Sequence, residues 1–224
     1  MNREFSKMAT SMVFPLAVVA VMWIVKIAEY YTGSDFGELG IMPLTAKGLI
    51  GIVTAPFIHA DFGHLVANTI PMFVSLSIIF YFYREVAFQV FFLVWLFTGV
   101  WVWSFARDDS FHIGASGLVY GYISFLFFSG MIRRNARLMA ISFLIIFLYG
   151  GFFWGIFPDF FPKRNISWES HLMGGIAGIV MAIFYRKKGL QREVYHWEED
   201  DDDDEEDDEN ADYMAGDDEF QGKA

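Results

Sequence analysis

Long apolar segments recur along the first 185 residues of the chain, and short polar stretches separate them. A helix needs about 20 mostly apolar residues to cross the hydrocarbon core of a bilayer. Six segments meet this requirement, and two of them have almost no polar face, which a helix of a soluble bundle would need. The pattern therefore predicts an all-α, polytopic membrane protein with six transmembrane helices. The predicted spans are residues 11–30, 63–83, 86–105, 113–132, 138–157 and 166–185.

One further apolar stretch and two prolines refine this picture. Residues 48–58 are apolar, but this stretch of 11 residues is too short to cross a bilayer. It predicts an interfacial or re-entrant piece between the first two spans. Pro15 is expected in the opening turn of the first helix, where its missing N–H matters least. Pro71 lies mid-span, where neighbouring helices can satisfy the freed carbonyl.

Composition divides the chain into a membrane body and a polar tail. Hydrophobic residues make up 55% of the chain. Residues 193–224 carry a net charge of −16, whereas residues 1–192 carry +5. We expect a cytoplasmic N-terminus over residues 1–10, a membrane domain over 11–185, and a cytoplasmic tail over 186–224 that is first basic and then acidic and disordered. This distribution excludes a typical nucleic-acid binder, and the lack of Cys excludes a disulfide scaffold or a thiolate metal site.

The placement of Lys and Arg predicts the orientation, because cytoplasmic loops carry an excess of these side chains. With the N-terminus on the cytoplasmic side, ten of them fall inside and five fall outside. The sequence therefore predicts a cell-membrane protein with both termini inside. The five outer cations are Lys26, Lys47, Arg107, Lys163 and Arg164.

Polar side chains gather at the start of the second, fourth and sixth predicted spans. Such groups are costly inside a membrane and by default indicate a function. These three spans cross the bilayer in the same direction, so their first turns share one depth, just below the outer surface. The side chains concerned are His59, His64 and Asn68 in the second group, Ser116 and Tyr120 in the fourth span, and His171 in the sixth.

Ser116 and His171 are the residue types that nucleophilic acyl transfer requires. A serine hydroxyl is a poor nucleophile unless a base removes its proton, and neutral imidazole has a suitable pKa. The developing oxyanion then needs donors, for which the side chains of His64 and Asn68 and the Ser116 backbone N–H are suitable. Glu169 lies on a different helical face from His171, so the pattern predicts a dyad. This mechanism needs neither a metal nor an organic cofactor.

Glycines near these side chains would let the fourth and sixth helices approach closely, which brings Ser116 within reach of His171. Each feature also has a simpler explanation, since a glycine-rich stretch can be a packing motif and a membrane histidine can be structural, a metal ligand or part of a proton path. A small transporter or proton channel is therefore an alternative, with His59, His64, His112 and His171 as its relay. The glycines are Gly114, Gly117, Gly174 and Gly178.

Together these motifs resemble the rhomboid intramembrane serine proteases over about residues 50–185. The resemblance implies a rhomboid-like six-helix bundle with Ser116 as nucleophile and His171 as general base and then general acid. It also implies that Tyr120 stacks on His171, that His64 and Asn68 join the oxyanion hole, and that His59 lies near the active site. The matching motifs are His59-x4-His64-x3-Asn68, Gly114-Ala-Ser116-Gly117-x2-Tyr120 and His171-x2-Gly174-x3-Gly178.

The resemblance further implies a substrate, namely a single-pass membrane protein that is cut in or near its transmembrane segment from the extracytoplasmic side. The alternative within the family is an inactive relative that binds transmembrane clients, although the presence of both Ser116 and His171 weighs against it. Many members carry a Trp-Arg pair in the loop before the second helix. The corresponding residues 49–52 of this chain are Leu-Ile-Gly-Ile. This difference bears on how the loop is anchored in the bilayer. Residues 150–165 are a predicted lateral gate. The natural substrate and the oligomeric state do not follow from the sequence.

Overall fold

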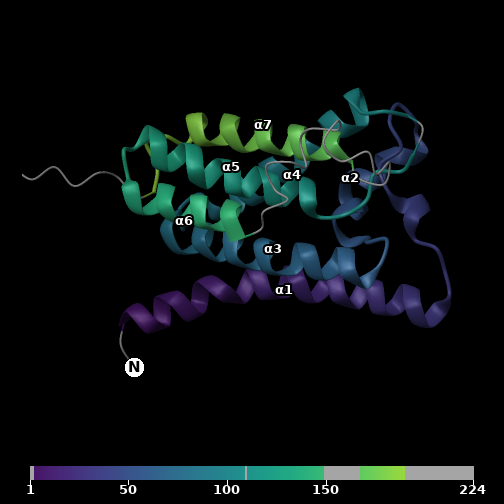
Figure 1. Ribbon diagram of the computed structural model, residues 1–224, viewed down its shortest axis with the longest axis horizontal. Helices are drawn as coiled ribbons and strands as arrows, with labels where there is room; N and C mark the ends of the chain where they lie inside the picture. Colours follow the sequence, from purple (N-terminus) through teal and green to yellow (C-terminus); the bar gives the residue numbers. More distant parts are fainter. Residues whose placement is uncertain (1–2, 109, 149–166, 190–224) are drawn as a thin grey trace, which may run out of the picture. The chain divides into compact units, whose positions relative to one another are not determined.

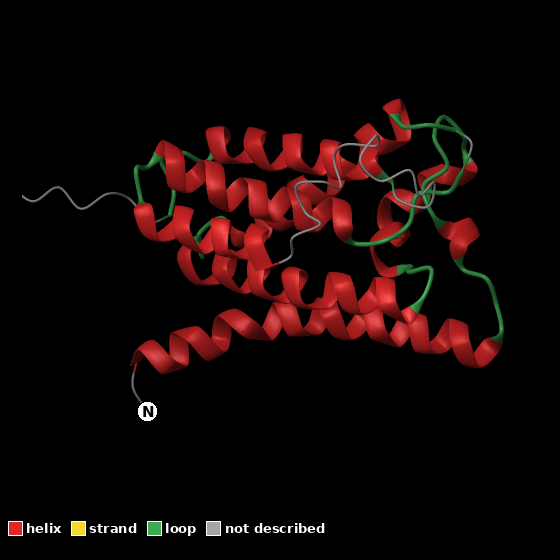
Figure 2. Ribbon diagram, in the orientation of Figure 1, coloured by secondary structure: helices red, strands yellow, loops and turns green. Residues whose placement is uncertain are grey.

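The computed structural model describes residues 3–108, 110–148 and 167–189, so the predicted gate and the acidic tail lie outside the described residues. The described part is helical apart from its loops and one isolated antiparallel bridge between Ile41 and His112 (Figures 1 and 2). The predicted all-α class is therefore confirmed. The long helices are α1 (Arg3–Thr32), α3 (Phe62–Phe82), α4 (Ala87–Phe105), α5 (Ser116–Ile132), α6 (Ala136–Leu148) and α7 (Trp168–Phe184).

Each predicted span overlaps one of these six helices. By length and composition, α1, α3 and α4 are long and apolar enough to cross a membrane. α5 and α7 have 17 residues each, at the short end of the spanning range. Large apolar side chains such as Leu16, Phe92 and Phe147 are exposed on the outward faces of α1, α4 and α6. These faces suit hydrocarbon better than water.

The start of α1 differs from the prediction. The helix begins at Arg3, so Pro15 lies well inside it and not in its opening turn. No Gly or Pro interrupts residues 3–14, and a run of good helix formers allows the helix to extend beyond the apolar segment.

The start of α5 also differs, because this helix begins at Ser116 and not at residue 113. Gly114 has a φ of +104°, which no α-helix includes and which favours glycine. Ser116 is therefore the first helical residue, whereas a span that begins at residue 113 would place it at the end of the first turn. Its backbone N–H accordingly belongs to the first turn, where no partner exists within the same helix.

The short apolar stretch forms three brief helical turns. They are η2 (Lys47–Leu49), α2 (Gly51–Thr54) and η3 (Ala55–Phe57), and none is long enough to span. Trp95 of α4 fastens this segment by donating its Nε1–H to the Ile52 carbonyl at 2.7 Å. The segment therefore packs against α4 and does not form a span of its own.

α5 packs against α7, α6, α3 and α4, while α1 packs along α3 (Figure 1). The buried core lies between these helices, and it brings the first turns of α3, α5 and α7 together at one end. Core residues include Leu65 and Leu76 of α3, Val94 of α4, Ile123 and Phe125 of α5, and Ala177 of α7.

Candidate active site

Glycines bring the backbones of α5 and α7 into direct contact. A Cβ on Gly174 would lie 1.9 Å from the Gly117 carbonyl oxygen, and a Cβ on Gly178 would lie 2.0 Å from the Gly121 carbonyl oxygen. Such distances leave no room for a side chain, which is how small residues four apart let helices approach. Gly121 was not among the predicted residues, although its spacing from Gly117 carries the same signal.

This close approach brings Ser116 and His171 together. The Ser116 hydroxyl oxygen lies 2.8 Å from His171 Nε2. Ser116 is the first residue of α5, and His171 lies in the first turn of α7 with 7% of its surface exposed. A hydroxyl and an imidazole at hydrogen-bond distance form the arrangement in which a base can activate a serine.

The ring of Tyr120 covers one face of His171. The two ring centroids are 4.1 Å apart and the ring planes differ by 6°. Tyr120 is buried one helical turn after Ser116, so the same helix carries both neighbours of the imidazole. Stacking of this kind limits rotation of the imidazole and keeps Nε2 directed towards the hydroxyl.

His64 lies in the first turn of α3, beside the start of α5. Asp61 caps this helix by accepting a hydrogen bond from the His64 N–H at 2.7 Å. A Cβ on Gly114 would lie 2.7 Å from His64 Cε1, so the imidazole lies against the Gly114 backbone. Gly114 therefore provides both the turn that precedes Ser116 and the space that His64 occupies.

Asn68 is buried one turn after His64, with its amide group directed along α3. Asn68 Nδ2 donates to the His64 carbonyl at 3.0 Å. An amide has two N–H donors, so this bond leaves a second one for another acceptor. The structure therefore places Asn68 next to the site and joins it to the backbone of His64.

His59 lies in the loop before α3 and is almost completely buried, with 1% of its surface exposed. Its ring meets the His64 ring edge to face, with the centroids 5.0 Å apart. Burial, helped by the nearby His64 and the Lys26 ammonium, lowers the pKa of His59 to about 4. Opposing effects come from the Phe57 carbonyl and Glu29, which favour the protonated ring. His59 is therefore neutral at neutral pH.

This pKa predicts that the free energy of unfolding falls as the pH drops from about 6.5 towards 4. The unfolded chain takes up a proton at His59 below about pH 6.5, whereas the folded chain takes it up only below about pH 4. Between these values the unfolded state binds more protons, which costs up to ~1.4 kcal/mol per pH unit. The measurement is thermal unfolding in detergent at pH 7 and pH 5. His59→Gln should reduce the difference between the unfolding temperatures at pH 7 and pH 5. An unchanged difference would mean that other titrating groups cause the loss of stability.

A second polar cluster joins the loop before α5 to the start of α7. His112 Nδ1 lies 2.6 Å from the Ser167 hydroxyl, and its Nε2 lies 2.9 Å from the Arg107 carbonyl. The Arg107 guanidinium donates to the carboxylate of Glu169, whose side chain is 4% exposed. The sequence did not indicate this ion pair, because Arg107 and Glu169 are 62 residues apart and belong to different segments.

We expect Arg107→Met to destabilise the protein more than Glu169→Gln. The first change leaves a buried carboxylate without its partner, at a cost of about 1–3 kcal/mol. The second leaves a guanidinium that is 41% exposed and can be solvated by water. Thermal unfolding of both variants in one detergent measures the difference, and the reverse order of stabilities would contradict this explanation.

Among the described residues, the His59 ring contacts the His64 ring, His112 contacts the Ser167 hydroxyl, and His171 contacts the Ser116 hydroxyl. Within the described ranges, no three His, Cys, Asp or Glu side chains gather closely enough to hold a metal ion.

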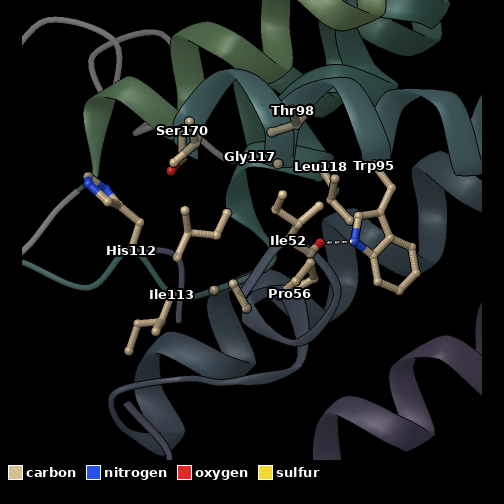
Figure 3. Close-up of a pocket in the computed structure, with 14 residues that line it drawn as sticks. Ile52, Pro56, Trp95, Thr98, His112, Ile113, Gly117, Leu118 and Ser170 are labelled. Atoms are coloured by element: carbon tan, nitrogen blue, oxygen red, sulfur yellow. Dashed lines mark hydrogen bonds between the residues drawn. The ribbon is translucent and has the colours of Figure 1, made fainter. Parts of the chain in front are cut away.

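A small cavity lies beside the dyad, between α4, α5 and the short turns of residues 51–57 (Figure 3). Its volume is about 20 Å³, which is room for a single water molecule. The lining is mostly apolar, but it includes the buried Thr98 hydroxyl, which has no hydrogen-bond partner among the described residues.

Comparison with known proteins gives the site a family context. The family model described as Rhomboid domain matches residues 46–188. Uncharacterized proteins of Mycobacterium bovis and Mycobacterium tuberculosis are each 34% identical to the chain over 177 residues, which is 75% of this chain and 72% of theirs. An uncharacterized protein of Mycobacterium leprae is 35% identical over 175 residues, covering 75% of this chain and 68% of its own length. The residues matched by the family model include α2 to α7 and every predicted site residue.

Proposed function

This chain belongs to the rhomboid family, and from that premise we propose that it is an intramembrane serine endopeptidase. It cuts single-pass membrane proteins in or near their transmembrane segments. The observation that carries this proposal is the distance of 2.8 Å between the Ser116 hydroxyl oxygen and His171 Nε2.

In the proposed reaction, His171 Nε2 accepts the hydroxyl proton while Ser116 Oγ attacks the carbonyl carbon of the scissile peptide bond. The tetrahedral intermediate collapses as the imidazolium gives this proton to the leaving amine, and an acyl-enzyme remains. Water then attacks the ester, with His171 acting as base and afterwards returning the proton to Ser116. Tyr120 supports these steps because its ring holds the imidazole at a fixed orientation.

The oxyanion would form at the N-terminal end of α5. The Ser116 backbone N–H belongs to the first turn of this helix, and the positive end of a helix dipole favours negative charge there. The His64 ring lies against Gly114, close enough to the same turn to act as a second donor. The unused N–H of Asn68 is a candidate for the third.

The substrate class follows from the chemistry of a bilayer. A transmembrane helix hides its carbonyls in internal hydrogen bonds, so a substrate must unwind locally before a serine can reach one. We propose that both termini are cytoplasmic and that the site opens to the extracytoplasmic side, as the distribution of Lys and Arg favours. Water for deacylation would then enter from that side.

The test uses the full chain in liposomes with labelled single-pass substrates whose transmembrane segments contain Gly or Pro. Wild-type protein should release two fragments, and Ser116→Ala should release none. Ser104→Ala is the matched control and should leave cleavage unchanged, because among the described residues Ser104 bonds the Val100 carbonyl of its own helix, at 2.8 Å, and no side chain of the site. Binding of these substrates without any cleavage by the wild type would instead identify an inactive relative that captures transmembrane clients.

A further inference from the structure

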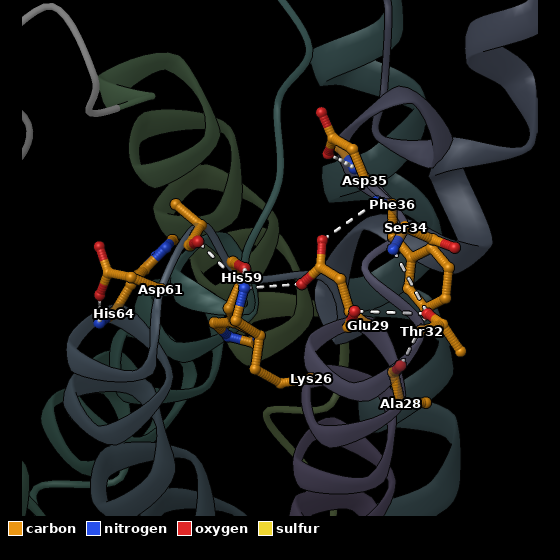
Figure 4. Close-up of polar contacts among 12 residues, drawn as sticks. Lys26, Ala28, Glu29, Thr32, Ser34, Asp35, Phe36, His59, Asp61 and His64 are labelled. Atoms are coloured by element: carbon orange, nitrogen blue, oxygen red, sulfur yellow. Dashed lines mark hydrogen bonds and ion pairs between the residues drawn. The ribbon is translucent and has the colours of Figure 1, made fainter.

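Lys26 is a lysine buried in the apolar helix α1, with 8% of its surface exposed. Its Nζ donates to Glu29 Oε2 at 2.6 Å, to the His59 carbonyl at 2.8 Å and to the Ala60 carbonyl at 3.0 Å (Figure 4). An ammonium has three N–H donors, so all three are used at once. A charged group in a membrane helix is costly and indicates a specific use.

The two carbonyls belong to residues 58–61, which connect η3 to α3 without helical structure of their own. Ile58 and Asp61 at the two ends of this connection have extended backbones. The His59 and Ala60 carbonyls therefore belong to no helix, and the carbonyl of the buried His59 needs a donor. Lys26 supplies that donor from another helix, and charge makes these hydrogen bonds strong.

Glu29 completes the arrangement on the side of α1. Its Oε2 accepts from the Lys26 ammonium, and its Oε1 accepts the Phe36 N–H at 3.0 Å. The carboxylate therefore neutralises the buried ammonium and also holds the loop after α1. Figure 4 shows Glu29 between Lys26 and Phe36. Together the pair links three segments, namely α1, residues 33–36 and residues 58–61.

A short path leads from this pair to the dyad. The His59 ring meets the His64 ring, and the His64 ring lies against Gly114, two residues before Ser116. The position of His64 therefore depends on where residues 58–61 are held. An apolar side chain in place of Lys26 would remove the ammonium donor from both carbonyls and the counter-charge from the Glu29 carboxylate, and the connection would shift.

We propose that Lys26 and Glu29 are positioning residues that hold the connection before α3, and through it the His64 imidazole, at the Ser116 end of α5. This inference rests on the proposed function, in which His64 stabilises the oxyanion. If the His64 imidazole is displaced, it stabilises the transition state less well, whereas binding of the substrate changes little. The variants should therefore lower kcat and leave KM nearly unchanged.

The test compares Lys26→Met, Lys26→Arg and Glu29→Gln with wild type. Lys26→Met should lower kcat roughly tenfold or more, slow the reaction of Ser116 with a fluorophosphonate by a similar factor, and leave KM within about twofold. Lys26→Arg keeps the charge and donors and should recover part of the loss. Amide hydrogen exchange should become faster at residues 58–64 in Lys26→Met.

The matched control is Lys47→Met. Lys47 pairs with Glu38 at 2.6 Å, but both side chains are more than half exposed, so this variant should behave as wild type in every assay. A folded Lys26→Met protein with wild-type kcat, or with unchanged exchange at residues 58–64, would overturn the proposal. If Lys26→Met does not fold, the other two variants decide. The proposal would be overturned if both Lys26→Arg and Glu29→Gln had the kcat of wild type and its rate of amide hydrogen exchange. A wild-type protein that neither cleaves nor labels would overturn the proposed function instead, and the exchange comparison would still decide whether Lys26 holds the connection.

Discussion

Ser116→Ala should lower kcat for a transmembrane substrate by at least about a thousandfold. The reason is that this change removes the hydroxyl that lies 2.8 Å from His171 Nε2. His171→Ala should cause a loss of the same order, because Ser116 then has no base to accept its proton. Initial cleavage rates in liposomes at saturating substrate measure both effects.

The double variant provides the sharper form of this prediction. When two residues act as one catalytic unit, the effects of mutating them on kcat do not add. The double variant with Ser116→Ala and His171→Ala should therefore be no slower than the slower single variant. Each variant must also unfold within a few degrees of wild type, which separates loss of chemistry from loss of fold. Additive effects in the double variant, or substantial cleavage by Ser116→Ala, would mean that the two side chains do not work together.

Gly174→Ala should disrupt the packing of α5 against α7. Its Cβ would lie 1.9 Å from the backbone carbonyl of Gly117, and backbone cannot move aside as a flexible side chain can. We expect a loss of about 1–3 kcal/mol in the free energy of unfolding. Separation of α5 from α7 would also move His171 away from Ser116, and a shift of 1 Å can cost about a hundredfold in rate.

Gly175→Ala is the matched control, one residue along the same helix. Among the described residues, its Cβ would meet the Ser124 hydroxyl alone, at 3.5 Å, which is an ordinary contact. Alanine also favours helix over glycine by about 1 kcal/mol. Thermal unfolding and fluorophosphonate labelling should therefore show a wild-type or slightly more stable protein. Equal losses in the two variants would show that the close approach of α5 and α7 does not matter.

Much of the fold could be predicted because membrane helices are recognisable from length and hydrophobicity alone. Alternate spans of a bundle run in the same direction, so counting the predicted spans indicated that Ser116, His171 and His64 lie at one end. The start of α5 could not be predicted, because periodicity does not show that Gly114 takes a φ of +104°. Pro15 was misplaced because residues 3–10 mix polar and apolar side chains and continue the helix beyond the apolar segment.

The long-range polar contacts could not be predicted for a different reason. Lys26 and Glu29 have the i,i+3 spacing of neighbours on one helix face, but the two backbone carbonyls that Lys26 also bonds are 33 and 34 residues away. Arg107 and Glu169 meet only because α4 and α7 come together. Side-chain type and spacing carry no information on such contacts, since they depend on how loops connect the helices.

Mass spectrometry of the fluorophosphonate-treated protein tests the Ser116–His171 pair most directly. The wild-type chain should gain one adduct, which peptide mapping should place on Ser116, and His171→Ala should lose it while remaining folded. Two results would contradict a reaction that begins at the Ser116 hydroxyl. One is an adduct on a different serine. The other is efficient substrate cleavage by a protein that the reagent never modifies at Ser116.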